Sequence, residues 1–197
     1  MEKINESIAS WPSLSNGIHY NWLVDYPAYS AFGTYELSNE DWEKRDFIQN
    51  FKGNSELTTE TDHQQAMSKA ISLVSDYVIE HFGEEAKQLC LLCVPASLQS
   101  ATKRRFEHFS DQVCQLTGME NLYPAISFTS EVDEVGDTVD TSHLDAHLLQ
   151  GKRILIFDDI IASGGSLARF ADKLSELQGE VVAALALGKK ISDGYDQ

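Results

Sequence analysis

The chain has 197 residues, of which 42% are hydrophobic and 23% are charged, so it is long enough for one α/β domain with a full core and an appended segment. Its formal net charge of −16 argues against a broad contact with the phosphate backbone of a nucleic acid, because a polyanion would be repelled. We therefore expect no direct nucleic-acid partner, although the same charge also serves solubility alone.

The three cysteines, Cys90, Cys93 and Cys114, are a sparse and odd set. Cys90 and Cys93 lie in an apolar run that predicts a strand, and side chains three positions apart on a strand point to opposite faces. We predict buried free thiols, not a metal site or a disulfide. The apolar runs are much shorter than a membrane span, and Met1–Ser10 lacks a basic-then-apolar pattern. We expect a reduced, cytoplasmic protein without a membrane partner.

Residues 1–61 form the first predicted region, an irregular N-terminal cap or hood that is rich in aromatic residues. Its periodicity is poor until Asp41–Lys52, where the spacing of the apolar residues predicts a short amphipathic helix. Such aromatic density is typical of a packed lid. A surface that stacks sugars or bases is the alternative interpretation.

Residues 62–197 form the second predicted region, an α/β core. Helices are predicted at Asp62–Phe82, Leu98–Leu116 and Gly165–Leu177, and strands at Gln88–Val94, Leu122–Phe128, Ile154–Phe157 and Val181–Leu187. Strands made of unbroken apolar runs indicate a parallel twisted sheet with helices on both faces, and ligands bind beyond the carboxyl ends of such strands. Thr129–Gln150 is acidic, polar and without clear periodicity, which predicts a long covering loop.

The chemistry is expected in the segment Gly151–Leu174. A buried strand is predicted to end in Asp158 and Asp159, and two adjacent carboxylates should face an open crevice and accept hydrogen bonds from hydroxyls, such as those of a ribose. The next residues open a helix, so that backbone amides, hydroxyls and the helix N-terminus converge on a phosphate. This second group consists of Ala162, Ser163, Gly164, Gly165 and Ser166. Together the two groups describe a site for a ribose 5-phosphate unit; an ordinary strand–turn–helix junction is the alternative.

The segment resembles the phosphoribosyl-diphosphate signature of the type I phosphoribosyltransferase family. The resemblance implies that the catalytic residues Asp158 and Asp159 bind the ribose hydroxyls and that Ala162–Ser166 binds the 5′-phosphate. It also implies 5-phosphoribosyl 1-diphosphate as the substrate, with Mg²⁺ as a cofactor that is held mainly through the diphosphate, without a metal site made by the protein alone. The implied reaction is displacement at the anomeric carbon by a nitrogen nucleophile, with release of diphosphate.

A weaker resemblance, over about residues 42–190, is to the ComF-like branch that is related to amidophosphoribosyltransferases. The motifs that carry it are Phe47–Lys52, Val94–Ser97 and Arg104–Phe106. The resemblance implies that Ala96 and Ser97 contact the diphosphate. The candidates for neutralising its charge are basic residues, for which a solvated surface role is the alternative: Lys52, Lys103, Arg104 and Arg105.

The chain departs from the family pattern in the loop that should close over the diphosphate. No Lys or Arg occurs from Phe106 to Gln150, whereas that stretch holds nine acidic residues. The loop cannot supply a cation unless His143 or His147 is protonated near the substrate; the alternative is that both are surface residues. Three functions stay open: a phosphoribosyltransferase, a non-catalytic sensor of phosphoribosyl diphosphate, and, by analogy alone, a ComF-like protein of competence and DNA uptake. The acceptor nucleophile and assembly into a homo-oligomer also stay open.

Overall fold

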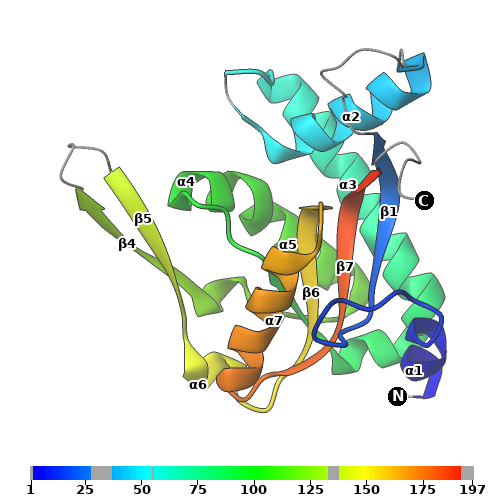
Figure 1. Cartoon of the computed structure of the whole chain (residues 1–197), viewed down its shortest axis with the longest axis vertical. Helices are drawn as coiled ribbons and strands as arrows, with labels where there is room; N and C mark the ends of the chain where they lie inside the picture. Colours follow the sequence, from blue (N-terminus) through cyan, green and yellow to red (C-terminus); the bar gives the residue numbers. More distant parts are fainter. Residues whose placement is uncertain (1, 28–36, 55, 133–137, 192–197) are drawn as a thin grey trace.

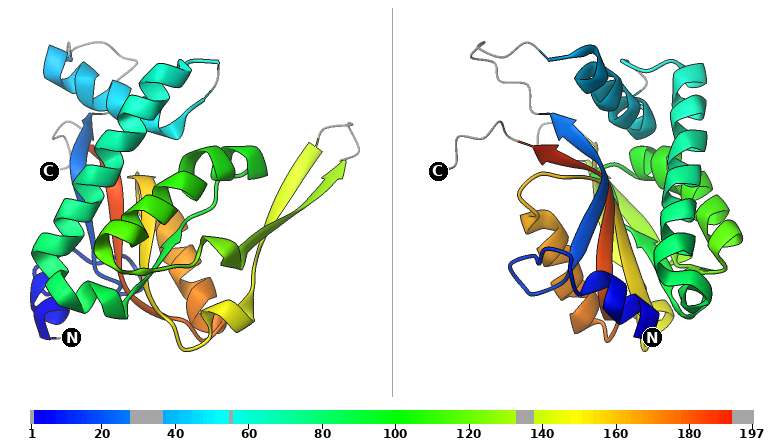
Figure 2. Two further views of the ribbon diagram at one scale, coloured as in Figure 1. Left: turned by 180° about the vertical axis from the view of Figure 1, so that it is seen from behind. Right: turned by 90° about the vertical axis from the view of Figure 1, so that its right-hand side faces the viewer.

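The computed structural model describes residues 2–27, 37–54, 56–132 and 138–191. Its centre is a five-stranded parallel sheet in the order β1-β7-β6-β2-β3. The strands are β1 (Tyr20–Pro27), β2 (Cys90–Cys93), β3 (Glu120–Asn121), β6 (Arg153–Ile161) and β7 (Glu180–Ile191). Helices lie on both faces of this sheet (Figures 1 and 2), so the fold class predicted from the apolar runs is confirmed.

The two faces of the sheet are covered by different helices (Figure 2). The helices α1 (Glu2–Ile8), α2 (Asn39–Lys52), α3 (Glu60–Phe82) and α5 (His108–Thr117) pack on one face, and α7 (Gly165–Glu176) covers the other. Alternate residues of β2 are sorted between two core clusters, with Leu91 and Cys93 in the first and Cys90 and Leu92 in the second. This sorting is what a strand buried on both faces requires.

The cysteine prediction is confirmed by this sorting. Cys90, Cys93 and Cys114 are free and buried, and Cys90 and Cys93 lie on opposite faces of the sheet. Burial raises the pKa of the Cys90 thiol to about 11 and that of Cys114 to about 12. These thiols therefore stay protonated near neutral pH and are poor nucleophiles.

The helices that carry the site begin and end at caps that are readable in the sequence. The Ser38 hydroxyl accepts from the Asp41 N–H, and the Asp41 carboxylate accepts from the Ser38 N–H, which is a capping box at the start of α2. The Thr59 hydroxyl accepts from the Asp62 N–H in the same way at the start of α3, and α3 ends at Gly83 as predicted. The predicted helix Asp41–Lys52 is therefore confirmed, with its end fixed beside the carboxyl edge of the sheet.

The predicted helix Leu98–Leu116 is present but irregular. It consists of α4 (Gln99–Thr102), a π-helical turn η2 (Lys103–Glu107) and α5, which follow one another without a break. Single π turns within α-helices are rare and occur frequently at functional sites. Here the turn holds three consecutive basic residues: Lys103, Arg104 and Arg105.

The predicted strand Leu122–Phe128 is only partly right, because Ile126–Phe128 lie in a strand, but that strand pairs outside the central sheet. In the central sheet the strand is limited to Glu120–Asn121, and Tyr123–Ala125 forms the 3₁₀ helix η3, which contains Pro124 near its start. Proline has no N–H to donate to a neighbouring strand, so the ladder stops there. A second 3₁₀ helix, η1 (Gly83–Gln88), connects α3 to β2.

The predicted loop Thr129–Gln150 is also corrected. The strands β4 (Ile126–Val132) and β5 (Thr138–Leu144) form an antiparallel hairpin that projects away from the sheet (Figure 1), and α6 (Ala146–Leu149) follows. Several of its cross-strand contacts are polar: Ser130 Oγ donates to Asp140 Oδ1 at 2.6 Å, and Thr129 Oγ1 lies 2.8 Å from His143 Nε2. Most residues of the two strands are polar, so the apolar alternation is weak. Residues 133–137 lie outside the described residues.

The predicted N-terminal cap contains regular structure as well. Tyr20–Pro27 pairs with β7 and is an edge strand of the central sheet, and α2 lies at the carboxyl end of that sheet (Figure 1). Residues 28–36 lie outside the described residues, and the boundary at residue 61 stays a prediction. Within the described part of the chain, no helix is long and apolar enough to cross a membrane.

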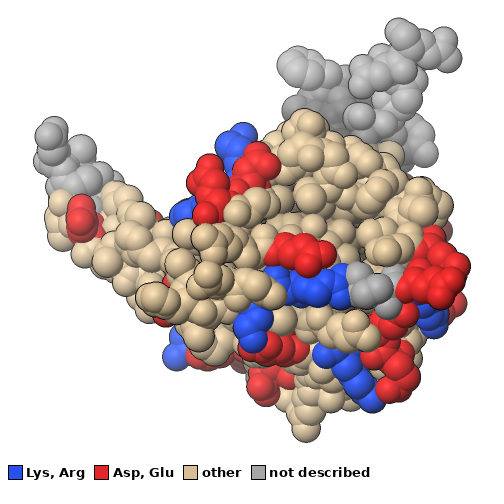
Figure 3. Space-filling view, turned by 90° about the horizontal axis from the view of Figure 1, so that it is seen from below, with Lys and Arg blue, Asp and Glu red and all other residues tan. Residues whose placement is uncertain are grey.

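Charged side chains form ion pairs at the amino ends of the strands. On that face, acidic and basic side chains lie next to each other (Figure 3). Lys87 lies 2.6 Å from Glu84, and Lys152 lies 2.6 Å from Glu120. The cations of interest for a ligand are found instead at the opposite, carboxyl end of the sheet.

Candidate functional site

The loop Ala162–Ser166 connects β6 to α7 at the carboxyl end of the sheet. Together with Asp158 it borders a cavity of about 120 Å³. Ala162, Ser163 and Ser166 are exposed, and no described side chain caps the start of α7. The first backbone N–H groups of a helix have no partner within it, so they can donate to an anion. The loop therefore has free donors for an anion, and its role as a 5′-phosphate site stays a prediction.

The two loop glycines have different roles. Gly164 has a φ of 79°, in the left-handed region, and a Cβ there would lie 2.8 Å from Leu14 Cδ2. Any side chain at this position would strain the backbone and displace Leu14. A Cβ at Gly165 would lie 3.6 Å from Arg169 Nη1 and 3.7 Å from Ser163 Oγ, which are ordinary contact distances. A side chain at Gly165 would thus enter the mouth of the loop without a clash at its Cβ.

Arg169 is a cation at this loop that the sequence analysis did not assign. Its Nη2 donates to Ser166 Oγ at 3.1 Å, and its Nη1 lies beside Gly165. The signal was present in the helical spacing, because residues three and four positions apart lie on the same face of a helix. The loop Ala162–Ser166 therefore has one guanidinium beside it in addition to its amides and hydroxyls.

The two aspartates lie within β6 and not at its end. β6 continues to Ile161, which pairs with Lys189 of β7, whereas β2 stops at Cys93 opposite Phe157. Beyond Phe157, β6 therefore has a paired neighbour in β7 but none in β2, so the backbone at Asp158 and Asp159 is uncovered on the β2 side. Because neighbouring side chains of a strand point to opposite faces, Asp158 borders the loop cavity, and Asp159, only 3% exposed, faces α2 and η2. The expectation that both carboxylates face one crevice is corrected.

Asp159 is held by two cations from distant parts of the chain. It forms an ion pair with Arg105 Nη1 from η2, and Lys52 Nζ from the end of α2 lies 3.4 Å from its Oδ1. The Arg105 Nε is buried and has no hydrogen-bond partner among the described atoms. Both of these cations were candidates for the diphosphate, and in this state they neutralise a carboxylate instead.

Asp158 is in a different electrostatic position. Burial and, after it, the charge of Asp159 raise the pKa of Asp158 to about 7, while the N–H of Asp159 donates to Asp158 Oδ1 at 2.8 Å. Near neutral pH this carboxyl group therefore exists in both forms. The ionised form accepts hydrogen bonds from hydroxyls, and the protonated form also donates one.

The remaining basic candidates are divided between two environments. Arg104 donates from Nε to the Gly53 carbonyl oxygen at 2.8 Å and from Nη2 to Glu60 at 2.8 Å. Lys103 is exposed, with its Nζ 3.8 Å from Glu107. A cavity of about 400 Å³ is bordered by three of the four predicted cations: Lys52, Arg104 and Arg105.

The turn after β2 fits its predicted role only in part. Ser97 is exposed, but the Ala96 N–H donates to Thr102 Oγ1 at 2.9 Å, so this amide is engaged. His143 lies in the hairpin, next to Thr129, and His147 lies in α6, at the end of the sheet opposite the loop (Figure 1). His147 is therefore not placed to neutralise a ligand at Ala162–Ser166.

No group of three or more His, Cys, Asp or Glu side chains in the described ranges is arranged to hold a metal ion. The carboxylate that borders the loop cavity is Asp158. Mg²⁺ prefers oxygen ligands and keeps several of its waters, and it commonly binds through one or two carboxylates and substrate phosphates. The residues present fit an ion of this kind with Asp158 nearby and the ligand oxygens as its main donors.

No protein-family model matches the chain. Similar solved structures include an adenine phosphoribosyltransferase from Rhodothermus marinus, with 21% identity, a TM-score of 0.40, and 60% of this chain and 66% of that chain covered. A phosphoribosylpyrophosphate synthetase from Mycobacterium smegmatis has 17% identity, a TM-score of 0.39, and coverages of 61% and 33%. A hypothetical protein from Neisseria gonorrhoeae with bound ppGpp has 11% identity, a TM-score of 0.41, and coverages of 68% and 72%. The chain spans less than two thirds of the length of the first two. These are distant likenesses of fold, among which phosphoribosyltransferases are found.

Proposed function

We propose that this protein binds 5-phosphoribosyl 1-diphosphate, with the 5′-phosphate at Ala162–Ser166 and the ribose at Asp158. The observation that carries the proposal is the position of Asp158 on the same cavity as the loop. A phosphate monoester needs several donors and a positive potential, which the helix N-terminus and Arg169 supply. The ribose hydroxyls need an acceptor close to that phosphate, which Asp158 supplies.

The diphosphate is expected on the other side of β6. The cavity bordered by Lys52, Arg104 and Arg105 has the charge that this group requires. A diphosphate would compete with Asp159 for Lys52 and Arg105, and a freed Asp159 would become an acceptor for a second ribose hydroxyl. Ligand binding would thus complete the pair of carboxylates that the sequence motif suggests.

The proposed reaction transfers the phosphoribosyl group to a nitrogen nucleophile. A bond forms between this nitrogen and the anomeric carbon, and the bond from that carbon to the diphosphate oxygen breaks, with the electron pair leaving on diphosphate and a proton of the attacking nitrogen passing to solvent. Mg²⁺, when bound through the ligand, supplies additional charge neutralisation for the leaving group. Lys52 and Arg105 orient the diphosphate, and Asp158 orients the ribose and favours positive charge at the anomeric carbon.

A non-catalytic sensor is the second candidate. It is favoured by the hairpin β4–β5, whose sequence has no Lys or Arg, and by the engagement of Lys52 and Arg105 with Asp159. Such a protein would bind the same ligand without turnover. The ComF-like branch remains a proposal that rests on sequence motifs alone.

The test is a calorimetric titration with phosphoribosyl diphosphate and Mg²⁺, combined with detection of diphosphate release in the presence of ammonia or a panel of bases. Binding with release supports the transferase, and binding without release supports the sensor. The Gly165→Val variant tests the loop itself. Its side chain enters the mouth of the loop, so we expect the affinity of the variant for phosphoribosyl diphosphate to be lower than that of the parent by about a hundredfold. Equal affinities of variant and parent would remove the loop from the site.

A further inference from the structure

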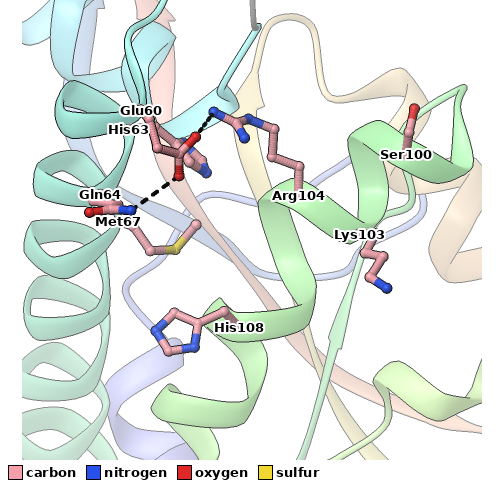
Figure 4. Close-up of a pocket in the computed structure, with 8 residues that line it drawn as sticks. All are labelled: Glu60, His63, Gln64, Met67, Ser100, Lys103, Arg104 and His108. Carbon is pink, nitrogen blue, oxygen red and sulfur yellow. Dashed lines mark hydrogen bonds and ion pairs between the residues drawn. The ribbon is translucent and has the colours of Figure 1, made fainter.

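A second and larger cavity lies between two helices on the α3 side of the sheet (Figure 4). Its volume of about 620 Å³ is within the range of small-molecule sites, roughly 300–1,000 Å³. One wall is a single face of the first turns of α3, and the other is the face of α4, η2 and α5 opposite it. It shares no residue with the loop cavity, and it shares Ser100 and Arg104 with the cavity at Lys52.

The rim of this cavity holds two cations, Lys103 and Arg104, and one carboxylate, Glu60. Lys103 has 66% of its side chain exposed and lies 3.8 Å from Glu107, a distance at which the pair is weak. Arg104 borders the cavity while it donates to Glu60, which also accepts from Gln64 (Figure 4). Figure 4 shows the Arg104 guanidinium directed at Glu60 and the Lys103 ammonium apart from it. In a chain with a net charge of −16, a cavity lined by two cations and one carboxylate favours a small anion over any extended polyanion.

The deeper part of the cavity suits a flat ring. The buried Met67 side chain and the ring of His108 both point into the space between the helices (Figure 4). His63 also borders the cavity, and its Nδ1 lies 2.8 Å from the Asn50 carbonyl oxygen, which can only accept. In the neutral ring Nδ1 therefore carries the proton, and Nε2 is an acceptor. Thioether and imidazole groups pack well against heteroaromatic rings.

We propose that this cavity is a second ligand site, which takes a nucleotide with its phosphate at Lys103 and Arg104 and its base between Met67 and His108. The cations of the rim alone would suit inorganic phosphate, and the surface of Met67 and His108 alone would suit a neutral ring. A nucleotide combines both groups in one molecule of the right size. Gln64 and His63 offer a donor and an acceptor for the edge of the base.

The same geometry couples this site to the two aspartates, a step that rests on the proposed function. Arg104 holds the Gly53 carbonyl oxygen, next to Lys52, and Arg105 follows Arg104 in the π turn. A phosphate that draws the Arg104 guanidinium from Glu60 would shift both cations that hold Asp159. Nucleotide binding should therefore change the affinity for phosphoribosyl diphosphate, and the reverse effect must have the same size.

The test uses AMP as the probe. The comparison ligands are adenosine, which lacks the phosphate, and inorganic phosphate, which lacks the base. The Gly165→Val variant serves as the background, because AMP would otherwise also occupy the phosphate loop. We expect AMP to bind this variant more tightly than adenosine or phosphate does, and Lys103→Gln to weaken AMP binding by about tenfold. The matched control is Lys87→Gln, which removes a surface lysine paired with Glu84, away from the cavity.

The histidine ring resonances of the parent protein give a readout that needs no variant. AMP should shift the signals of His63 and His108 and leave that of His147 in place. The absence of any AMP binding in the Gly165→Val background, or an equal affinity after Lys103→Gln, would overturn the second site. Ribose 5-phosphate that binds the parent but not Gly165→Val would still support the loop site, so failure of one proposal is distinguishable from failure of the other.

Discussion

On the α7 face of β6, Asp158 borders a cavity together with loop amides, hydroxyls and Arg169, whereas on the α5 face Asp159 is buried between Arg105 and Lys52. These two neighbours in one strand therefore differ: Asp158 is an acceptor that titrates near neutral pH, whereas the charge of Asp159 is balanced by two cations. The difference shows that neighbouring acids in a motif need not share a role in the ligand-free protein. The two positions should therefore respond to the same substitution in opposite ways.

The largest expected effect is on the buried ion pairs. Asp159→Asn removes the charge that balances Arg105 and Lys52, and breaking a buried pair from one side costs about 3–5 kcal/mol of unfolding free energy. Urea denaturation of the variant and the parent measures this loss. Adding Arg105→Met should recover a part of it, because the more deeply buried of the two unpaired cations is then removed. A loss below about 1 kcal/mol would mean that these ion pairs stabilise the fold no more than exposed surface pairs do.

The substitution Asp158→Asn should have the opposite sign. The folded pKa of Asp158, about 7, is above its ordinary value of 3.8, so the unfolded chain releases this proton first as the pH rises. The contribution of this group to folding therefore falls between about pH 4 and pH 7 and stays low above that. Asp158→Asn removes the penalty, so we expect the variant to be more stable than the parent at pH 8 and equally stable near pH 4. Denaturation at both pH values gives the answer, and a variant that is less stable at pH 8 contradicts it.

Much of the fold could be predicted because it follows from local patterns. Unbroken apolar runs indicated strands buried on both faces, and helical spacing of apolar residues indicated α3 as far as Phe82. The loop was readable because glycines and serines follow a strand directly. These features need no knowledge of what lies across the molecule.

The parts that could not be predicted depend on distant contacts. Arg105 is 54 positions from its partner Asp159, and nothing in either neighbourhood indicates the pairing. The end of β6 was placed too early because two acids resemble a strand terminus, whereas β7 supplies a partner as far as Ile161. The hairpin was missed because most of its residues are polar, with pairs such as Ser130 and Asp140.

The smallest of these effects is expected from a substitution of Arg169, which tests whether the α7 face of β6 is the face that binds the anion. Its guanidinium is exposed and donates to Ser166 Oγ, so Arg169→Gln should leave the unfolding free energy nearly unchanged. The affinity for ribose 5-phosphate should fall by about tenfold, because one charge-assisted contact is lost while the loop amides remain. Lys173→Gln, one helical turn further along α7, removes an equal charge away from the loop and should have little effect. Calorimetry at two salt concentrations distinguishes a specific contact from an effect of overall charge. A specific contact gives the two variants different affinities for ribose 5-phosphate at both salt concentrations. An effect of overall charge gives them the same affinity, and their difference from the parent disappears in high salt.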